Sequence, residues 1–183
     1  MKPRNIAFLL VLAALTATAC ADFKADIVMK NGGVTTTGKL LVKGDKSRIE
    51  FPTTIIIRRP DKGVSWMCST KSKTYAEMPD KQTGRRKAAY ESMPGVKRLG
   101  TETVSGYPCD KFQIVTGGRA PTSTTIWVSD KLNQELKVVS QSSAGTTTVD
   151  VQNIKRTFFF GKTFEIPKGY TKAPAPARVP MRR

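Results

Sequence analysis

The sequence contains no histidine, and its other reactive residues do not form a catalytic set. Without an imidazole, a Ser-His-Asp triad, a Cys-His pair and His-ligated zinc are all excluded. Ser105 and Ser129 therefore have no base to activate them. Asp45 and Glu50 are close in sequence, but their spacing does not set two carboxylates about one scissile bond. We expect a noncatalytic protein with no cofactor and no metal site.

Three cysteines remain as candidates for covalent chemistry: Cys20, Cys68 and Cys109. No two of them have the Cys-x-x-Cys spacing of a redox motif. Cys68 and Cys109 would be the thiols left in an exported chain, where disulfides persist, so a bridge between them is the natural interpretation. Closing a loop of about 40 residues would stabilise the fold by about 4 kcal/mol in the chain-entropy model. The alternative is two buried, unpaired thiols.

The first 21 residues have the pattern of a secretory signal peptide. Lys2 and Arg4 precede an apolar run at 6–15, which is too short to span a membrane, and small residues follow it. Cleavage after Ala21 would leave a soluble exported protein, which we expect to be periplasmic. Cleavage before Cys20 would instead allow acylation of its sulfur and give a lipid-anchored lipoprotein.

The chain is strongly basic, with 31 Lys and Arg against 14 Asp and Glu and a formal net charge of +17 over 183 residues. This length suits one domain. For an exported protein, an anionic membrane surface is a more plausible partner than nucleic acid. We expect no nucleic-acid binding, because the aromatic residues occupy apolar core positions and are not interleaved with basic ones. Arg85, Arg86 and Lys87 could contact lipid headgroups, or could form an ordinary solvated helix face.

From Asp22 onward, apolar and polar residues alternate and turn signals recur at short intervals, which predicts many antiparallel strands. The clearest is a hairpin in which Asn31, Gly32 and Gly33 reverse the chain. One short basic helix is expected around 85–93, where the period changes. The three phenylalanines 158–160 and the segment 164–166 are expected to close the domain. Eleven strands are expected, at 23–30, 34–43, 47–51, 53–59, 64–69, 74–78, 97–104, 108–116, 122–128, 136–141 and 146–157.

This count predicts a mainly β fold in three parts. Residues 1–21 form the signal peptide, 22–170 the β domain, and 171–183 a basic, proline-rich disordered tail. A sheet of about eleven strands twists and must close, stack or cup. Wrapped around the single helix, it would form a strongly curved antiparallel sheet, a half-open barrel with an apolar hollow. A filled core without a hollow is the alternative.

The order of the sequence signatures resembles a known family. The pieces are DFKADIVMKNGGVTTTGKLLVKGDKSRIEF, IIIRRPDKGVSWMCSTKSKTYAEM, LGTETVSGYPCDKFQI, TIWVSDKL and VQNIKRTFFFGKTFEIPKGY. Together they are similar to the uncharacterised LolA-like periplasmic proteins, relatives in fold of the outer-membrane lipoprotein-sorting carriers. The resemblance implies a half-open barrel with a helical plug and a concave face that accepts acyl chains. The carriers have several lid helices, whereas this sequence predicts one.

Two functional hypotheses follow. In the first, the concave face binds a lipid, a lipoprotein acyl chain or another amphiphile, with Trp66, Trp127, Phe112 and Ile56 as candidate lining residues. In the second, the protein is an envelope interaction or sensor module that binds another protein and needs no hollow. A tryptophan on a strand also fits plain core packing.

Overall fold

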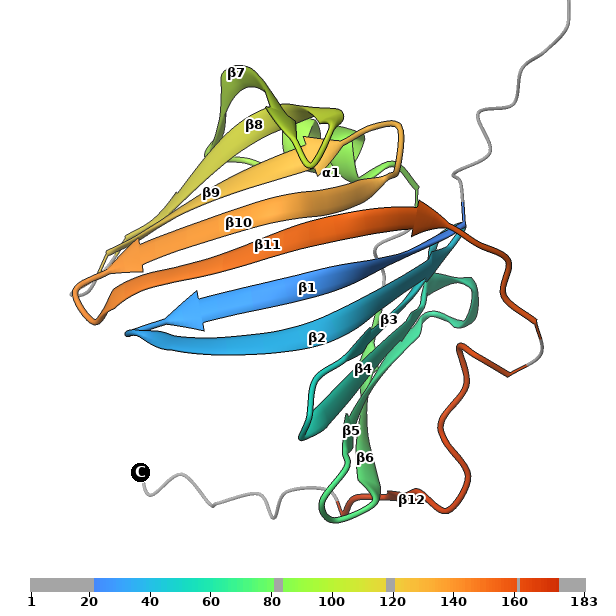
Figure 1. The fold of residues 1–183 in the computed structure, drawn as a ribbon. Helices are drawn as coiled ribbons and strands as arrows, with labels where there is room; N and C mark the ends of the chain where they lie inside the picture. Colours follow the sequence, from blue (N-terminus) through green and yellow to red (C-terminus); the bar gives the residue numbers. More distant parts are fainter. Residues whose placement is uncertain (1–21, 81–83, 118–120, 161, 175–183) are drawn as a thin grey trace, which may run out of the picture.

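The computed structural model describes residues 22–80, 84–117, 121–160 and 162–174. The strand count and the helix position predicted for 22–166 are confirmed, and a twelfth strand follows them. In chain order the elements are β1 (Phe23–Asn31), β2 (Val34–Lys43), β3 (Lys46–Glu50), β4 (Thr54–Arg59), a 3-10 turn (Pro60–Lys62), β5 (Val64–Ser69), β6 (Thr74–Pro79), α1 (Arg86–Ser92), β7 (Val96–Val104), β8 (Tyr107–Thr116), β9 (Thr122–Ser129), β10 (Gln134–Ser142), β11 (Gly145–Arg156) and β12 (Thr171–Lys172) (Figure 1).

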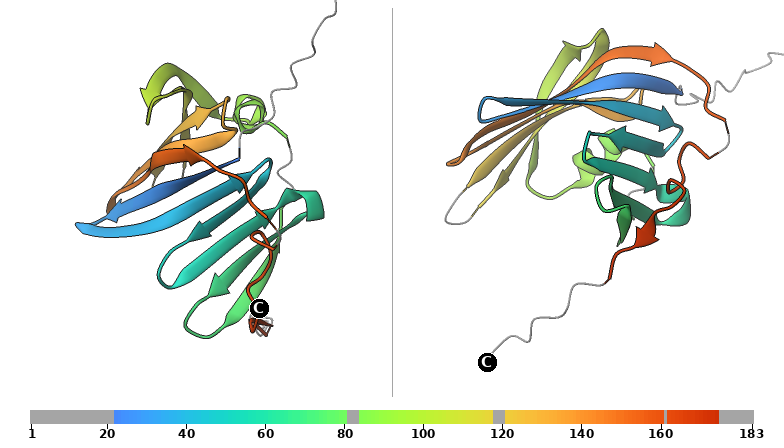
Figure 2. Two further views of the ribbon diagram at one scale, coloured as in Figure 1. Left: turned by 45° about the vertical axis from the view of Figure 1, so that its right-hand side comes forward. Right: turned by 60° about the horizontal axis from the view of Figure 1, so that its bottom comes forward.

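All twelve strands belong to one sheet in the order β12-β6-β5-β4-β3-β2-β1-β11-β10-β9-β8-β7. Every pairing is antiparallel except that of β12 with β6. The sheet curves strongly around α1, and its two edge strands, β12 and β7, do not pair with each other (Figure 2). Within the described residues it is therefore a half-open barrel, as predicted.

The two faces of the sheet differ in what covers them. We call the face that α1 contacts the inner face, and the opposite one the outer face. Because side chains alternate along a strand, the register assigns each residue to a face. Phe112, Ile126 and Val138 lie opposite one another on β8, β9 and β10, and Phe112 packs against Tyr90 of α1. These residues define the inner face.

The outer face of β3 to β6 is covered by the segment that follows β11. Phe164 is buried there against Ile57 and Trp66, and Ile166 and Tyr170 pack beside it. Arg59 is buried in this layer and donates from Nη1 to the carbonyl oxygen of Phe164 at 3.2 Å. The segment then ends in β12, which pairs with Thr74 and Tyr75 of β6.

The predicted tail boundary is corrected by β12. Residues 171–172 were expected to begin a disordered tail, but Thr171 donates to the carbonyl oxygen of Lys73 at 3.0 Å, and Ala173 donates to that of Tyr75 at 2.7 Å. Backbone pairing needs no apolar side chains, so composition gave no sign of it. The signal peptide at 1–21 and the tail at 175–183 lie outside the described residues.

Gly38 permits close packing in the middle of the inner face. It lies opposite Ile27 on β1, and a Cβ atom at this position would collide with the carbonyl oxygen of Glu50 and lie 2.8 Å from the ring of Phe51. Glycine is therefore required here by a close approach and not by a turn.

Candidate ligand-binding hollow

A hollow of about 270 Å³ lies between α1 and the inner face of the sheet. Its apolar walls come from six strands, and several of these side chains are almost fully buried, including Leu40 at 1% and Leu136 at 0% exposure. The lining residues with apolar side chains are Ile27, Leu40, Ile49, Tyr90, Ile126, Leu136, Val138, Val149 and Val151. Such a space, mostly apolar with a few polar groups, is typical of small-molecule sites.

Polar side chains are found at one end of the hollow. Gln134 and Glu135 of β10 contribute to its lining there. The register of β10 against β9 shifts between Glu135 and Lys137, so Glu135 lies opposite Val128 on the inner face, whereas Lys137 lies opposite Trp127 on the outer face. The bulge thus brings a carboxylate to an otherwise apolar wall.

Helix α1 closes this end through Tyr90 and Arg86. The Tyr90 ring stacks on Phe112, with centroids 5.6 Å apart and planes inclined by 23°, and its hydroxyl donates to Glu135 at 3.1 Å. Arg86 donates to both oxygens of Glu135, at 2.8 and 2.7 Å. Burial, together with the nearby Glu135 carboxylate, raises the pKa of Tyr90 well above its usual range. Tyr90 therefore remains neutral and keeps its proton for the hydrogen bond.

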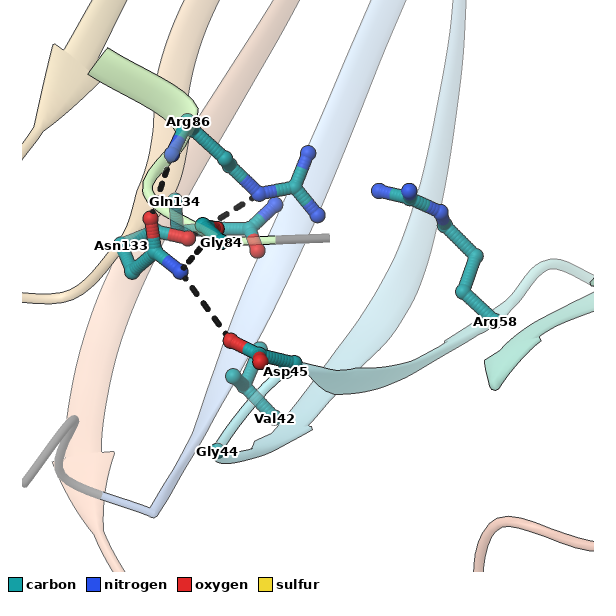
Figure 3. Close-up of a pocket in the computed structure, with 8 residues that line it drawn as sticks. All are labelled: Val42, Gly44, Asp45, Arg58, Gly84, Arg86, Asn133 and Gln134. Atoms are coloured by element: carbon teal, nitrogen blue, oxygen red, sulfur yellow. Dashed lines mark hydrogen bonds between the residues drawn. The ribbon is translucent and has the colours of Figure 1, made fainter. Parts of the chain in front are cut away.

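The start of α1 is fixed by Asn133, in the turn between β9 and β10. Asn133 Oδ1 accepts from the backbone N–H of Arg86 at 2.7 Å, and its carbonyl oxygen accepts from Arg86 Nε at 3.0 Å. Its amide donates to the carbonyl oxygen of Gly84 at 3.2 Å and to Asp45 at 3.3 Å. These groups surround a pocket of about 10 Å³, enough for a single water (Figure 3).

Arg58 extends into the same pocket from the opposite side (Figure 3). It is held by Asp80 through two hydrogen bonds of 2.8 and 3.0 Å, and Ser65 also donates to Asp80 at 2.7 Å. The hydrogen bonds to Asp80 raise the pKa of Arg58. Buried side-chain polar atoms among the described residues all have partners. The ionised groups of the inner face are thus neutralised in pairs beside the apolar space.

An apolar row leads out of the hollow toward the β6 edge of the sheet. Leu40, Ile49, Ile56, Met67 and Ala76 are consecutive cross-strand neighbours on β2 to β6. The first two line the hollow, Ile56 is half-buried, and Met67 is 45% exposed. The inner face therefore continues beyond the hollow as an open apolar track.

The predicted lining residues divide between the two faces. Ile56 lies on the track, and Phe112 lies on the inner face beneath Tyr90. Their contact with a ligand stays a prediction. Trp66 and Trp127 are on the outer face and do not line the hollow, which corrects their assignment. Periodicity shows which residues share a face but not which face is concave, and that was the source of the error.

Each tryptophan has an outer-face environment of its own. Trp66 is buried under Phe164 and donates to Glu77 at 3.0 Å. Trp127 donates to Glu102 at 2.9 Å, and the ammonium groups of Lys111 and Lys137 lie 4.7 and 5.2 Å from its ring centroid. Lys62 Nζ lies 5.7 Å from the ring centroid of Trp66, so both rings serve packing and cation–π contacts.

The three basic residues predicted to contact headgroups are all engaged within the protein. Arg86 is buried against Glu135 and Asn133. Arg85 donates to the carbonyl oxygen of Asp130 at 2.7 Å. Lys87 lies 3.2 Å from Asp110, whose hydrogen bond raises the pKa of Lys87. The Arg86 assignment is corrected to a structural role, and headgroup contact by Arg85 and Lys87 stays a prediction.

The predicted Cys68–Cys109 disulfide is not formed. Both thiols are free and buried, and they pack in different core clusters, Cys68 with Ile55, Ile57 and Trp66 and Cys109 with Phe23 and Trp127. Burial raises the pKa of both thiols, that of Cys109 to about 11. The strands β5 and β8 that carry them are far apart in the sheet order, which the sequence did not reveal. Cys20 lies outside the described residues.

Tyr90 and Glu135 are site residues that sequence reasoning missed. Tyr90 is the aromatic residue of the predicted helix, so its position on a plug was a usable signal. Glu135 gave none, because its orientation depends on the bulge in β10. Among the described residues, no three or more Cys, Asp or Glu side chains are grouped to hold a metal ion. The described part of the chain also lacks a helix that is long and apolar enough to span a membrane.

A single curved antiparallel sheet with one helix against its inner face is the class of fold that the described residues adopt. The chain belongs to the DUF4412 family, described as a domain of unknown function, which matches residues 21–135. None of the curated proteins matches the chain.

Solved structures share this fold at low sequence identity. An uncharacterized conserved protein from Thermus thermophilus has a TM-score of 0.55 and 13% identity, over 85% of this chain and 91% of that one. A chain of the Pseudomonas aeruginosa MucA/MucB complex has a TM-score of 0.52 and 12% identity, over 79% of this chain and 55% of that one. A LolA superfamily protein from Nitrosomonas europaea has a TM-score of 0.41 and 10% identity, over 80% of this chain and 90% of that one.

Proposed function

We propose that this protein is a noncatalytic cell-envelope protein that binds the apolar part of a lipid, a lipoprotein acyl chain or another amphiphile between α1 and the inner face. The observation that carries the proposal is the apolar hollow of about 270 Å³. It is larger than the cavity of ~150 Å³ that accepts a benzene molecule in an engineered protein core. Most of its lining residues have apolar side chains.

The open track over Ile56 and Met67 favours a long ligand over a compact one. A chain that fills the hollow could continue along this row, because its residues are neighbours across β3 to β5. Met67 adds adaptability, since an unbranched thioether side chain fits ligands of different shape. Export through the segment at 1–21 would bring the protein to the lipids and lipoproteins of the envelope.

Binding of a fluorescent fatty acid by a variant with a filled hollow tests this proposal. Val149 is half-buried and lines the hollow, so Val149→Phe should occupy the space and abolish uptake. Val115→Phe is the matched control, because Val115 is 60% exposed and lies outside the lining. It should bind as the unaltered protein does. Equal binding by both variants, or no uptake and no lipid in native mass spectra of the purified protein, would refute the proposal.

A second candidate is a protein-binding envelope module. It is supported by the fold shared with a chain of a two-protein complex, MucA/MucB. The edge strand β7 has an unpaired side on which a partner strand could add. Two results together would favour this candidate over the first. The protein would take up no fatty acid, and it would form a complex of fixed stoichiometry with one envelope protein that Val149→Phe leaves unaffected.

A further inference from the structure

Phe158 and Phe160 are the most exposed large apolar residues among those described. Their side chains are 84% and 86% exposed, although the sequence predicts that 158–160 close the domain. That expectation holds only for Phe159, which packs edge-to-face on Phe164 with ring centroids 5.4 Å apart and planes inclined by 83°. The middle ring points into the protein, and the flanking two project into solvent.

The backbone around these rings is fixed by contacts to the sheet. Lys43 Nζ donates to the carbonyl oxygen of Phe159 at 2.9 Å, and Thr163 Oγ1 donates to that of Phe160 at 3.0 Å. Arg48 donates to the carbonyl oxygen of Thr163 at 3.2 Å. Figure 1 shows this segment leaving the end of β11, swinging outward and returning toward β12. The loop that carries the two exposed rings is therefore anchored by hydrogen bonds to its backbone.

Exposed basic residues lie on the segments next to the pair. Lys155 and Arg156 end β11 just before it, and Lys24 and Phe23 of β1 lie opposite them. Asp22, which precedes Phe23, accepts a backbone hydrogen bond from Gly44 at 3.3 Å, and Asp26 is paired with Lys39. This corner of the molecule is thus apolar at its tip and cationic behind it. The exposed basic residues are Lys24, Lys43, Lys155, Arg156 and Lys162.

We propose that Phe158 and Phe160 insert into an anionic lipid surface, with these five basic residues against its headgroups. Phenylalanine gains free energy when it leaves water for the headgroup–acyl boundary, and Lys and Arg near the surface are attracted to anionic lipids. Two exposed rings with a cationic surround meet both requirements. The site is separate from the hollow, because neither ring nor any of the five basic residues lines it.

Vesicle co-sedimentation of the mature protein tests this site. Vesicles of phosphatidylcholine with about one third phosphatidylglycerol should bind the protein, vesicles of phosphatidylcholine alone should bind it much less, and about 0.5 M salt should release it. Phe158→Ser/Phe160→Ser should weaken binding by about tenfold or more, since both apolar contacts are lost.

The matched control is Val34→Ser/Val115→Ser, which changes two other exposed apolar residues, at 66% and 60% exposure. It should bind vesicles as the unaltered protein does. Both double variants should keep the melting temperature and the fatty-acid uptake of the hollow, so failure of this site is distinguishable from failure of the proposed function. Equal vesicle binding by the phenylalanine variant and the unaltered protein, or no preference for anionic vesicles, would overturn the inference.

Discussion

Tyr90 stacks on Phe112, with 5.6 Å between ring centroids, and so ties the only α-helix among the described residues to the inner face of the sheet. The same residue forms part of the hollow wall and donates to Glu135. One side chain therefore couples the stability of the fold to the shape of the candidate site.

Truncating Tyr90 should affect both properties. Tyr90→Ala removes the stacked ring and should lower the free energy of unfolding by about 3 kcal/mol and weaken fatty-acid binding. Tyr90→Phe keeps the ring and loses one hydrogen bond, so it should cost about 1 kcal/mol and preserve binding. Urea unfolding and fatty-acid titration measure the two effects. Equal losses for both variants would contradict a role for ring stacking.

The Arg86–Glu135 pair should show strong coupling. The side chains are 10% and 17% exposed and are joined by two hydrogen bonds. Arg86→Met alone should cost about 3 kcal/mol or more, because it leaves Glu135 without its countercharge. The double variant Arg86→Met/Glu135→Leu should recover part of this loss. A double-mutant cycle from urea unfolding measures it, and strict additivity would show that the pair does not interact.

Gly38 should tolerate no side chain. Gly38→Ala places a methyl group against the Glu50 carbonyl and the Phe51 ring, and should destabilise the protein by about 1–3 kcal/mol. Gly117→Ala is the control, because no atom lies within 4 Å of its added Cβ and its backbone is not left-handed. Thermal unfolding of both compares them. A stable Gly38→Ala protein would show that β2 and β3 approach less closely.

Acid should destabilise the outer face of the fold. Hydrogen bonds from Arg59 hold the pKa of Asp61 well below its usual range. Partial burial acts to raise the pKa of Glu165, but the hydrogen bonds from Arg59 and Lys62 outweigh it, so the pKa of Glu165 is also lowered. Below the ordinary carboxyl pKa the unfolded chain binds more protons than the folded one. The stability these pairs contribute is therefore complete above about pH 5 and falls as the pH drops below about 4.

Melting temperatures between pH 6 and pH 3 measure this loss. Asp61→Asn should lower the melting temperature at pH 6 and reduce its decline toward pH 3, since one of the titrating groups is gone. An unchanged pH profile in this variant would mean that Asp61 is not held in its ionised form by Arg59.

The two buried thiols should be unreactive in the folded protein and reactive after unfolding. Each is shielded, and burial raises the pKa of each, so little thiolate is present at neutral pH. A thiol reagent should modify neither Cys68 nor Cys109 without denaturant, and both in its presence. An intact mass two units lower than expected, with no modification of the denatured protein until a reductant is added, would show that Cys68 and Cys109 form a disulfide after all.

Local pattern specified much of this fold. Alternation and turn residues placed the eleven strands from β1 to β11, and the change of period at 85–93 placed α1, because both signals depend on neighbours in the sequence. The burial of Phe23, Ala25 and Ile27 follows from the same alternation. β12 was missed, because its two residues are ordered by hydrogen bonds to β6 and not by their own composition.

The candidate site depended on relationships between distant strands. Alternation could group Trp66 with Cys68, but only the curvature of the sheet decides that this group faces outward and that Ile27, Leu40 and Ile49 face α1. The separation of Cys68 from Cys109, the pairing of Arg86 with Glu135 and the outward position of Phe158 and Phe160 are likewise properties of the assembled sheet. By itself the sequence determined the strands, the helix and the absence of imidazole chemistry. The tertiary structure decided which face holds the hollow, because curvature is a property of all the strands together.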